Sequence, residues 1–199
     1  MRKLRRLWPA TVTLAALLML LALAGCAHTF NGVTGQAPAP DFRLTDQTGR
    51  PFRLSDFKGR WILLAYGYTH CPDVCPMTLS ILRDVKKQIG ADDQTLGVAF
   101  VTIDPERDTA EIMGRYVAHF DAAFKGLTGT PAEIAAAAAP YNVKYEKKAS
   151  TPAVGYVMNH TAFVYLIDPQ FRLRVTYPFG VKSEEIAGDL RYLMSQPAD

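Results

Sequence analysis

Hydrophobic positions along this chain follow two alternating patterns, short continuous runs and longer runs with helical spacing. Residues 61–67 and 96–103 are almost entirely apolar, which is typical of strands covered on both faces. Between these runs, apolar side chains recur every three or four positions, at Met77, Leu79, Ile81, Leu82, Val85 and Ile89. This spacing predicts a helix over Pro76–Ile89 that buries one face against the strands.

The same patterns predict the remaining elements. Further helices are expected at Thr109–Phe120, Pro131–Ala139 and Ser183–Met194, with Asp108 and Ser183 as N-caps of the first and last. Further strands are expected at Gly126–Leu127, Val143–Lys147, Ala162–Ile167 and Arg172–Tyr177, with the last two antiparallel. The segments Asp41–Leu44 and Pro51–Leu54 flank a Gly-containing turn and predict an N-terminal β-hairpin.

Strands that alternate with helices, followed by a hairpin and a closing helix, predict an α/β fold. We expect a central mixed sheet flanked by helices, with the hairpin at its N-terminal end. The helix directly after the first buried strand carries Cys71 and Cys75 at its start, an arrangement typical of a thioredoxin-like sandwich. We find no internal repeat, and we place this domain at residues 41–196.

The first 25 residues predict a secretory signal. Four basic residues lie in positions 2–6, and an apolar run without charge extends from about Thr11 to Ala24. That run is at the short end for a membrane-spanning helix, which needs about 20 apolar residues. The sequence Leu-Ala-Gly-Cys at 23–26 resembles the lipobox of bacterial lipoproteins, which implies that Cys26 is lipidated and becomes the mature N-terminus. A standard signal cut near Ala24 and an uncleaved anchor are the alternatives.

Composition and charge indicate a folded domain and argue against a nucleic-acid-binding protein. Hydrophobic residues make up 49% and charged residues 21%, as in an ordinary folded domain. The net charge of +3 comes from the leader, because 18 basic and 19 acidic residues remain after its four basic residues are removed. This balance leaves no basic surplus for a nucleic acid partner. Residues 26–40 are small, polar and rich in Pro and Gly, and predict a flexible linker after Cys26.

Cys71 and Cys75 are the two cysteines left for chemistry. A disulfide between residues four apart closes almost no loop and stabilises little, so a redox or metal-binding role is favoured over a structural one. Each cysteine precedes a proline. We therefore expect Pro76 to begin the helix, Cys75 to cap it and Cys71 to lie on the preceding loop. The helix N-terminus favours the thiolate form of both sulfurs.

The residue types leave a disulfide exchanger and a soft metal site open. Thioredoxin-type exchangers use a C-x-x-C spacing, whereas this chain has C-x-x-x-C, and structural zinc usually needs four ligands. His160 precedes a predicted strand at a point where the loop of a thioredoxin-like fold returns over the cysteines, which makes it a candidate ligand. His70 is a weaker candidate, since its side chain beside Cys71 can point to the site or to solvent. Two thiolates and one imidazole are soft donors that suit Cu(I) and tolerate Cu(II). An oxidised pair could hold no copper, so such a site needs a reductant partner.

Three blocks together resemble the Sco/SenC family: residues 66–76 (YGYTHCPDVCP), residues 101–109 (VTIDPERDT), and His160 before 165–168 (YLID). The similarity covers about residues 40–195. It implies a thioredoxin-like copper metallochaperone that binds one copper ion through Cys71, Cys75 and His160 and assists assembly of the binuclear copper site of cytochrome c oxidase. Asp73 and Asp104 match acidic positions of the family motifs, and Asp104 is a candidate for supporting His160.

The resemblance also implies partners and a location. The expected partners are the copper-centre subunit of cytochrome c oxidase, another periplasmic copper chaperone and a thiol reductant. The domain is expected on the periplasmic side of a bacterial membrane, held by its lipid anchor. Binding and delivery are expected rather than enzymatic turnover. The alternative is an extracytoplasmic thiol-disulfide oxidoreductase that uses a redox-active disulfide between Cys71 and Cys75 on the oxidase subunit or another copper protein.

Overall fold

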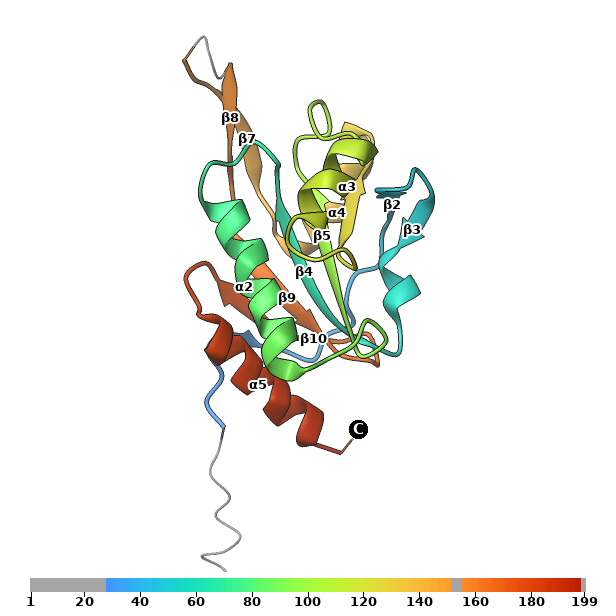
Figure 1. Ribbon diagram of the computed structural model, residues 1–199, viewed down its shortest axis with the longest axis vertical. Helices are drawn as coiled ribbons and strands as arrows, with labels where there is room; N and C mark the ends of the chain where they lie inside the picture. The colour runs from blue at the N-terminus through green and yellow to red at the C-terminus, as the bar shows by residue number, and fades with distance from the viewer. Residues whose placement is uncertain (1–27, 152–154, 198–199) are drawn as a thin grey trace, which may run out of the picture.

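The computed structural model describes residues 28–151 and 155–197, which form a central sheet, a separate hairpin and four α-helices (Figure 1). The sheet has eight strands in the order β1-β10-β9-β4-β5-β6-β2-β3. The strands are β1 (Val33–Thr34), β2 (Arg43–Asp46), β3 (Pro51–Arg53), β4 (Trp61–Gly67), β5 (Leu96–Thr102), β6 (Lys125–Thr128), β7 (Tyr145–Ala149), β8 (Tyr156–His160), β9 (Phe163–Ile167) and β10 (Leu173–Pro178). The helices are α2 (Val74–Ile89), α3 (Ala110–Ala118), α4 (Pro131–Ala138) and α5 (Ser183–Ser195), with 3-10 turns at Leu54–Phe57 and Ala139–Tyr141.

The centre of the sheet is mixed, as the sequence predicts. β4 pairs parallel with β5 and antiparallel with β9, and every residue of β4 and β5 is buried. Helices α2 and α5 lie side by side against the sheet, α3 packs on β6, and α4 lies near β2 (Figure 1). The predicted hairpin is present as β2 and β3, and β10 pairs antiparallel with β9. The expected α/β sandwich with an N-terminal hairpin is therefore confirmed.

The segment expected to be a flexible linker is instead packed on the domain from His28 onward. β1 pairs antiparallel with β10 at one edge of the sheet, and Pro38 forms an isolated bridge with Arg172. Ala39 is 6% exposed. A segment of small polar residues is flexible when its backbone groups have no partner other than water. Here the edge strand β10 offers unpaired N–H and C=O groups, and the segment pairs with them. Cys26, the predicted lipidation site, lies outside the described residues.

Three helix starts differ from the prediction. α2 begins at Val74 with Asp73 at its N-cap, so Cys75 lies in the first turn rather than at the cap. α3 is capped by Thr109, whose hydroxyl accepts from the Ile112 N–H, rather than by Asp108. At α5 the N-cap is Lys182, not Ser183, and the Glu185 carboxylate accepts its N–H at 2.8 Å.

The chain also contains a strand that its sequence pattern does not predict. β8 ends at His160 and pairs with β7 over five residue pairs, from Tyr145↔His160 to Ala149↔Tyr156. In the part of the chain that the structure describes, the two strands form a hairpin that pairs with no other strand. It projects beyond the carboxyl end of β4 at the top of Figure 1. The sequence pattern predicts a loop at His160, whereas this residue lies at the end of β8.

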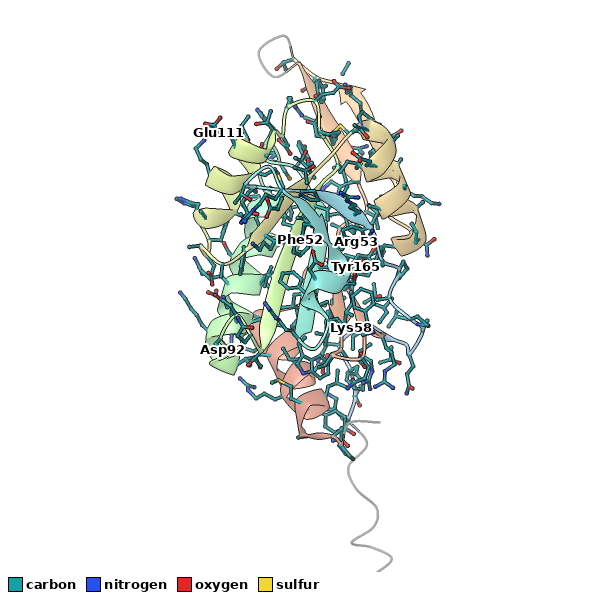
Figure 2. All side chains as sticks on the ribbon, turned by 90° about the vertical axis from the view of Figure 1, so that its right-hand side faces the viewer. Phe52, Arg53, Lys58, Asp92, Glu111 and Tyr165 are labelled. Carbon is teal, nitrogen blue, oxygen red and sulfur yellow. The ribbon has the colours of Figure 1, made fainter. Side chains whose placement is uncertain are left out.

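The start of α2 and the start of the described chain lie at opposite ends of the molecule. The N-terminal end of α2 and the β7–β8 hairpin lie at one end, whereas the described chain begins beside α5 at the other (Figure 1). Figure 2 shows Glu111 of α3 toward the first end, Lys58 and Asp92 toward the second, and Tyr165 in the interior between them. Within the described residues, we find no helix that is both long and apolar enough to span a membrane.

Candidate metal centre

Three soft donors converge at the carboxyl end of β4. Cys71 lies on the loop after β4, Cys75 in the first turn of α2, and His160 at the end of β8. Their ligand atoms all lie within 4.8 Å of one another, and Cys75 Sγ is 3.6 Å from His160 Nε2. The structure thus brings together the three residues that the sequence predicts as ligands, although 85 positions separate Cys75 from His160.

The local sequence explains how Cys75 reaches this place. Pro76 lies in the first turn of α2, where its missing N–H would have no partner in the helix anyway. Cys75 is 2% exposed and packs against the last residue of β4. That residue is Gly67, where a Cβ would lie 2.6 Å from Cys75 Sγ and 2.7 Å from the Phe100 ring. Only glycine leaves room for the sulfur at this position.

The two sulfurs form a coupled pair with opposite pKa shifts. The hydrogen bond from the Cys75 thiol lowers the pKa of Cys71 to about 3, and the backbone N–H groups of Asp73 and Cys75 act in the same direction. The Cys75 N–H donates to Cys71 Sγ at 3.4 Å. The same sulfur–sulfur hydrogen bond, together with burial, raises the pKa of Cys75. At neutral pH the pair therefore holds one thiolate, at Cys71, and one thiol, at Cys75.

The imidazole is held in the orientation that a metal ligand needs. His160 Nδ1 lies 3.0 Å from the Thr161 carbonyl oxygen, which can only accept, so Nδ1 carries the proton. Nε2 then presents its lone pair toward the sulfurs. The Tyr68 ring packs edge-on to the imidazole with centroids 6.0 Å apart.

A polar cluster beneath the β7–β8 hairpin holds β8, and sequence reasoning missed two of its members. The Tyr156 hydroxyl donates to Asp104 Oδ1 at 2.8 Å, and Arg107 Nε donates to Asp104 Oδ2 at 2.6 Å. The Arg107 guanidinium also lies 3.7 Å from the centre of the Tyr156 ring and donates to the Tyr156 carbonyl oxygen. Asp104 is 2% exposed, and among the described residues its carboxylate hydrogen-bonds to Arg107 and Tyr156 and not to His160. No local spacing in the sequence indicates that Arg107 and Tyr156 are neighbours.

Two other candidates do not join the three donors. The His70 ring is half exposed, and its Nδ1 lies 3.1 Å from Thr69 Oγ1. Asp73 acts through its backbone N–H toward Cys71, and its side chain has no hydrogen bond among the residues described. Its position as N-cap of α2 makes it a residue that shapes the loop.

The loop before Cys71 is held by a buried carboxylate. Asp108, expected as a helix cap, is instead fully buried and accepts from the Thr69 N–H at 3.0 Å and the Thr69 hydroxyl at 2.6 Å. It also accepts from Thr102 at the end of β5. Because the carboxylate links β5 to this loop, it fixes the path of the chain that leads to Cys71. Cys71 and Cys75 are both free cysteines here, and a redox-active disulfide between them stays a prediction.

Comparison with known families gives a match over most of the chain. A family model described as SCO1/SenC matches residues 32–195, which include all three donors. The human mitochondrial protein SCO2 homolog is 36% identical over 157 residues, which is 78% of this chain and 59% of that protein. The mouse mitochondrial SCO1 homolog is 38% identical over 151 residues, 75% of this chain and 53% of that protein. The chain thus spans less than two thirds of the length of these relatives.

Solved structures give the same picture. A Bradyrhizobium japonicum ScoI structure with copper bound is 39% identical, with a TM-score of 0.70 over 78% of this chain and 99% of that one. An Arabidopsis thaliana ScoI structure with copper bound is 29% identical, with a TM-score of 0.74 over 80% of this chain and 100% of that one. A Thermus thermophilus apo Sco1 structure is 35% identical, with a TM-score of 0.73 over 85% of this chain and 99% of that one.

Proposed function

The chain belongs to the SCO1/SenC family, and we propose that it is a membrane-tethered copper metallochaperone. In this proposal one copper ion is the cargo and Cys71, Cys75 and His160 are its ligands. The receiving protein is the copper-centre subunit of cytochrome c oxidase, whose binuclear copper site the family resemblance implies as the target.

The observation that carries the proposal is the cluster of two sulfurs and one imidazole within 4.8 Å. Thiolates favour Cu(I), and the added imidazole makes Cu(II) acceptable. The relatives from Bradyrhizobium and Arabidopsis were solved with copper bound, which supports copper as the ion. The lone pair of His160 Nε2 and the thiolate of Cys71 are both available without rearrangement.

Copper binding in this site releases one proton from the sulfur pair. Cys71 is already a thiolate, whereas the raised pKa of Cys75 means that its proton must leave before its sulfur binds. The site is thus loaded less readily in acid. Release to a partner is favoured when Cys75 regains its proton.

The anchoring part of the proposal concerns Cys26. A lipidated Cys26 would hold the domain on the periplasmic side of a bacterial membrane, near the end of the molecule where the described chain begins. The metal centre lies at the other end (Figure 1), where another periplasmic copper chaperone, a thiol reductant and the oxidase subunit can reach it.

The alternative, a thiol-disulfide oxidoreductase, has less support. The exposed thiolate of an exchanger must reach a substrate disulfide, and Cys71 is only partly exposed, with His160 beside it. An exchanger would turn over a disulfide substrate without metal, and its Cys75→Ser variant would trap a mixed disulfide through Cys71.

Copper titration of the reduced chain tests the proposal. We expect one equivalent bound and, for Cu(II), an absorption band from sulfur-to-copper charge transfer. His160→Ala should weaken binding and change this band, whereas His119→Ala, a matched change at the C-cap of α3, should alter neither. Equal affinity and spectra for wild type and His160→Ala would contradict the ligand assignment. Normal copper loading of the oxidase in a deletion strain would contradict the delivery role.

A further inference from the structure

A cleft of about 430 Å³ opens at the end of the molecule opposite the metal centre. It lies between the last turns of α5, the start of β4 and the turn that joins β9 to β10. Aromatic rings and two guanidinium groups line it: Phe30, Trp61, Tyr192, Arg172 and Arg174. None of the three donor residues of the metal centre lines this cleft, so it is a separate site.

Within residues 28–151 and 155–197, the two arginines pair with a single carboxylate. Arg172 Nε and Arg174 Nη1 donate to the same oxygen, Asp168 Oδ2, at 2.8 and 3.1 Å. Asp168 is 1% exposed, so two partly buried guanidinium groups share one buried carboxylate. In residues 28–151 and 155–197, their other guanidinium nitrogens have no recorded hydrogen-bond partner. N–H groups of this kind bind a phosphate or carboxylate with bidentate geometry.

The remaining lining favours an anion attached to an apolar body. Trp61, Tyr192 and Phe30 offer aromatic surface, the buried Leu193 adds to the apolar lining, and Met194, 38% exposed, extends it toward solvent. Aromatic side chains beside arginine are typical of surfaces that meet the headgroup region of a bilayer. A free inorganic anion would use only the guanidinium groups.

The chain itself limits how far this cleft lies from residue 26. His28 is fastened to the domain, with its Nε2 2.7 Å from the buried Asp189 and its ring stacked on Tyr192 at 4.1 Å. Phe30 lines the cleft and lies four residues after Cys26, a separation that spans at most about 14 Å. If Cys26 carries lipid, as proposed above, the headgroups of the bilayer lie within that reach.

We propose that this cleft binds the headgroup of an anionic phospholipid. The phosphate pairs with Arg172 and Arg174, and the glycerol and first acyl carbons lie on the aromatic rings. This contact holds the lower end of the domain in Figure 1 on the bilayer and directs the metal centre away from it. The inference rests on the proposed membrane anchor and adds a second, non-covalent contact with the lipid.

Trp61 provides the measurement. In the full chain carrying Trp8→Phe it is the only tryptophan, so its fluorescence reports on the cleft. We would titrate this chain with dihexanoyl phosphatidylglycerol below its micelle concentration, and separately with dihexanoyl phosphatidylcholine and with inorganic phosphate. Gln170→Glu adds a negative charge at an exposed cleft residue that takes no part in the Asp168 bonds. Gln94→Glu makes the same change at an exposed residue outside the cleft.

We expect saturable binding of phosphatidylglycerol, about tenfold weaker binding in Gln170→Glu, and no change in Gln94→Glu. Phosphatidylcholine should bind at least tenfold more weakly. The proposal is overturned by an unsaturable response, by equal binding of the two lipids, by equal binding of inorganic phosphate, or by an unchanged Gln170→Glu chain. Copper titration of the same chains separates the two proposals, because Gln170→Glu should bind copper normally even if it loses the lipid.

Discussion

Single residues determine the position and the protonation of the two cysteine sulfurs. Gly67 and Cys75 approach each other so closely that the glycine has no substitute, and Cys71 and Cys75 hold one proton between them. A Cβ at Gly67 would lie 2.6 Å from Cys75 Sγ, and the ligand atoms of the two cysteines lie within 4.8 Å of each other. Adding one methyl group at Gly67, or one proton at Cys71, is therefore enough to test them.

Gly67→Ala should weaken copper binding and destabilise the fold. The new Cβ would lie 2.6 Å from Cys75 Sγ, and relief of such a contact in a packed core costs about 1–3 kcal/mol. Chemical denaturation and copper titration measure the two effects. Gly188→Ala in α5 is the control, since a Cβ there meets nothing within 4 Å and alanine should stabilise the helix by up to about 1 kcal/mol. Equal copper affinity in Gly67→Ala and wild type would show that the sulfur has room to move.

Cys71 should react with iodoacetamide as a thiolate well into the acid range. Because its folded pKa is about 3, its thiolate fraction stays near its maximum from pH 8 down to pH 5 and falls only as the pH approaches 3. Alkylation rates followed by mass spectrometry should therefore change little between pH 8 and pH 5. Cys75, with its raised pKa and buried sulfur, should react slowly throughout. A rate for Cys71 that falls about tenfold per pH unit below pH 8 would contradict this assignment.

At the scale of elements, the metal centre depends on how the β7–β8 hairpin is attached. A two-stranded hairpin is marginally stable alone, and four of the five residues of β7 are exposed. Its described attachments include the Tyr156 hydroxyl on Asp104 and the buried Met158 side chain. The position of His160 therefore depends on contacts four residues earlier in the same strand.

Tyr156→Phe should loosen the hairpin and weaken Cu(II) binding about tenfold. The change removes the hydroxyl that donates to the buried Asp104 carboxylate and leaves the rest of the ring. A hydrogen bond to a charged group contributes about 1.5 kcal/mol, which corresponds to about tenfold in affinity. Copper titration and the Cu(II) electron paramagnetic resonance spectrum would report it. Lys148→Met on the same hairpin removes an exposed ion pair with Glu146 and should have no effect. If both variants bind copper like the wild type, the cluster does not position His160.

The N-terminal segment is attached by a second buried carboxylate. Asp189 in α5 is fully buried and accepts from His28 at 2.7 Å and from the Asn31 N–H at 2.9 Å. His28→Ala removes one of these partners and should lower the free energy of unfolding by about 1.5–3 kcal/mol, as measured by urea denaturation. Copper affinity should not change, because the metal centre lies at the other end of the molecule. An unchanged unfolding free energy would mean that this segment adds nothing to the fold.

The whole molecule couples metal binding to folding. Because the three donors come from β8, α2 and the loop after β4, the site exists only when the sheet and the hairpin are assembled. A ligand that binds only the folded state stabilises it by about 2.7 kcal/mol at 100 times its dissociation constant. For a domain of this size, that corresponds to a rise in Tm of about 5–11 °C.

Calorimetry with and without copper should show this rise at neutral pH. The rise should shrink as the pH falls, since the proton on Cys75 then competes with copper. The Cys71→Ser, Cys75→Ser double variant replaces each thiol by a hydroxyl of similar size and should show no copper-dependent rise in Tm. A shift of equal size in the double variant would place copper at another site.

Local patterns in the sequence determined most of the framework. The continuous apolar runs of β4 and β5, the helical spacing of α2 and the turn between β2 and β3 are encoded within short stretches, so they could be predicted without a partner. The two cysteines and their prolines likewise indicated a sulfur pair at a helix start, but the expected thiolate form holds for Cys71 and not for Cys75, whose pKa is raised. The third donor was inferred from the expected return of the chain over the cysteines, which is a property of the fold class.

Only the tertiary structure decided the contacts between distant segments. β8 forms because β7 lies beside it, Asp108 is buried because Thr69 and Thr102 reach it, and residues 33–34 form a strand because the edge of β10 is free. The β7–β8 hairpin is local in sequence. Asp108 and Thr69 are 39 positions apart, and Val33 pairs with Thr176, so these hydrogen bonds join distant segments. Such contacts cannot be predicted from the residues next to each partner in the sequence. In the unfolded chain both groups hydrogen-bond to water, and they bond to each other only after folding has buried them side by side.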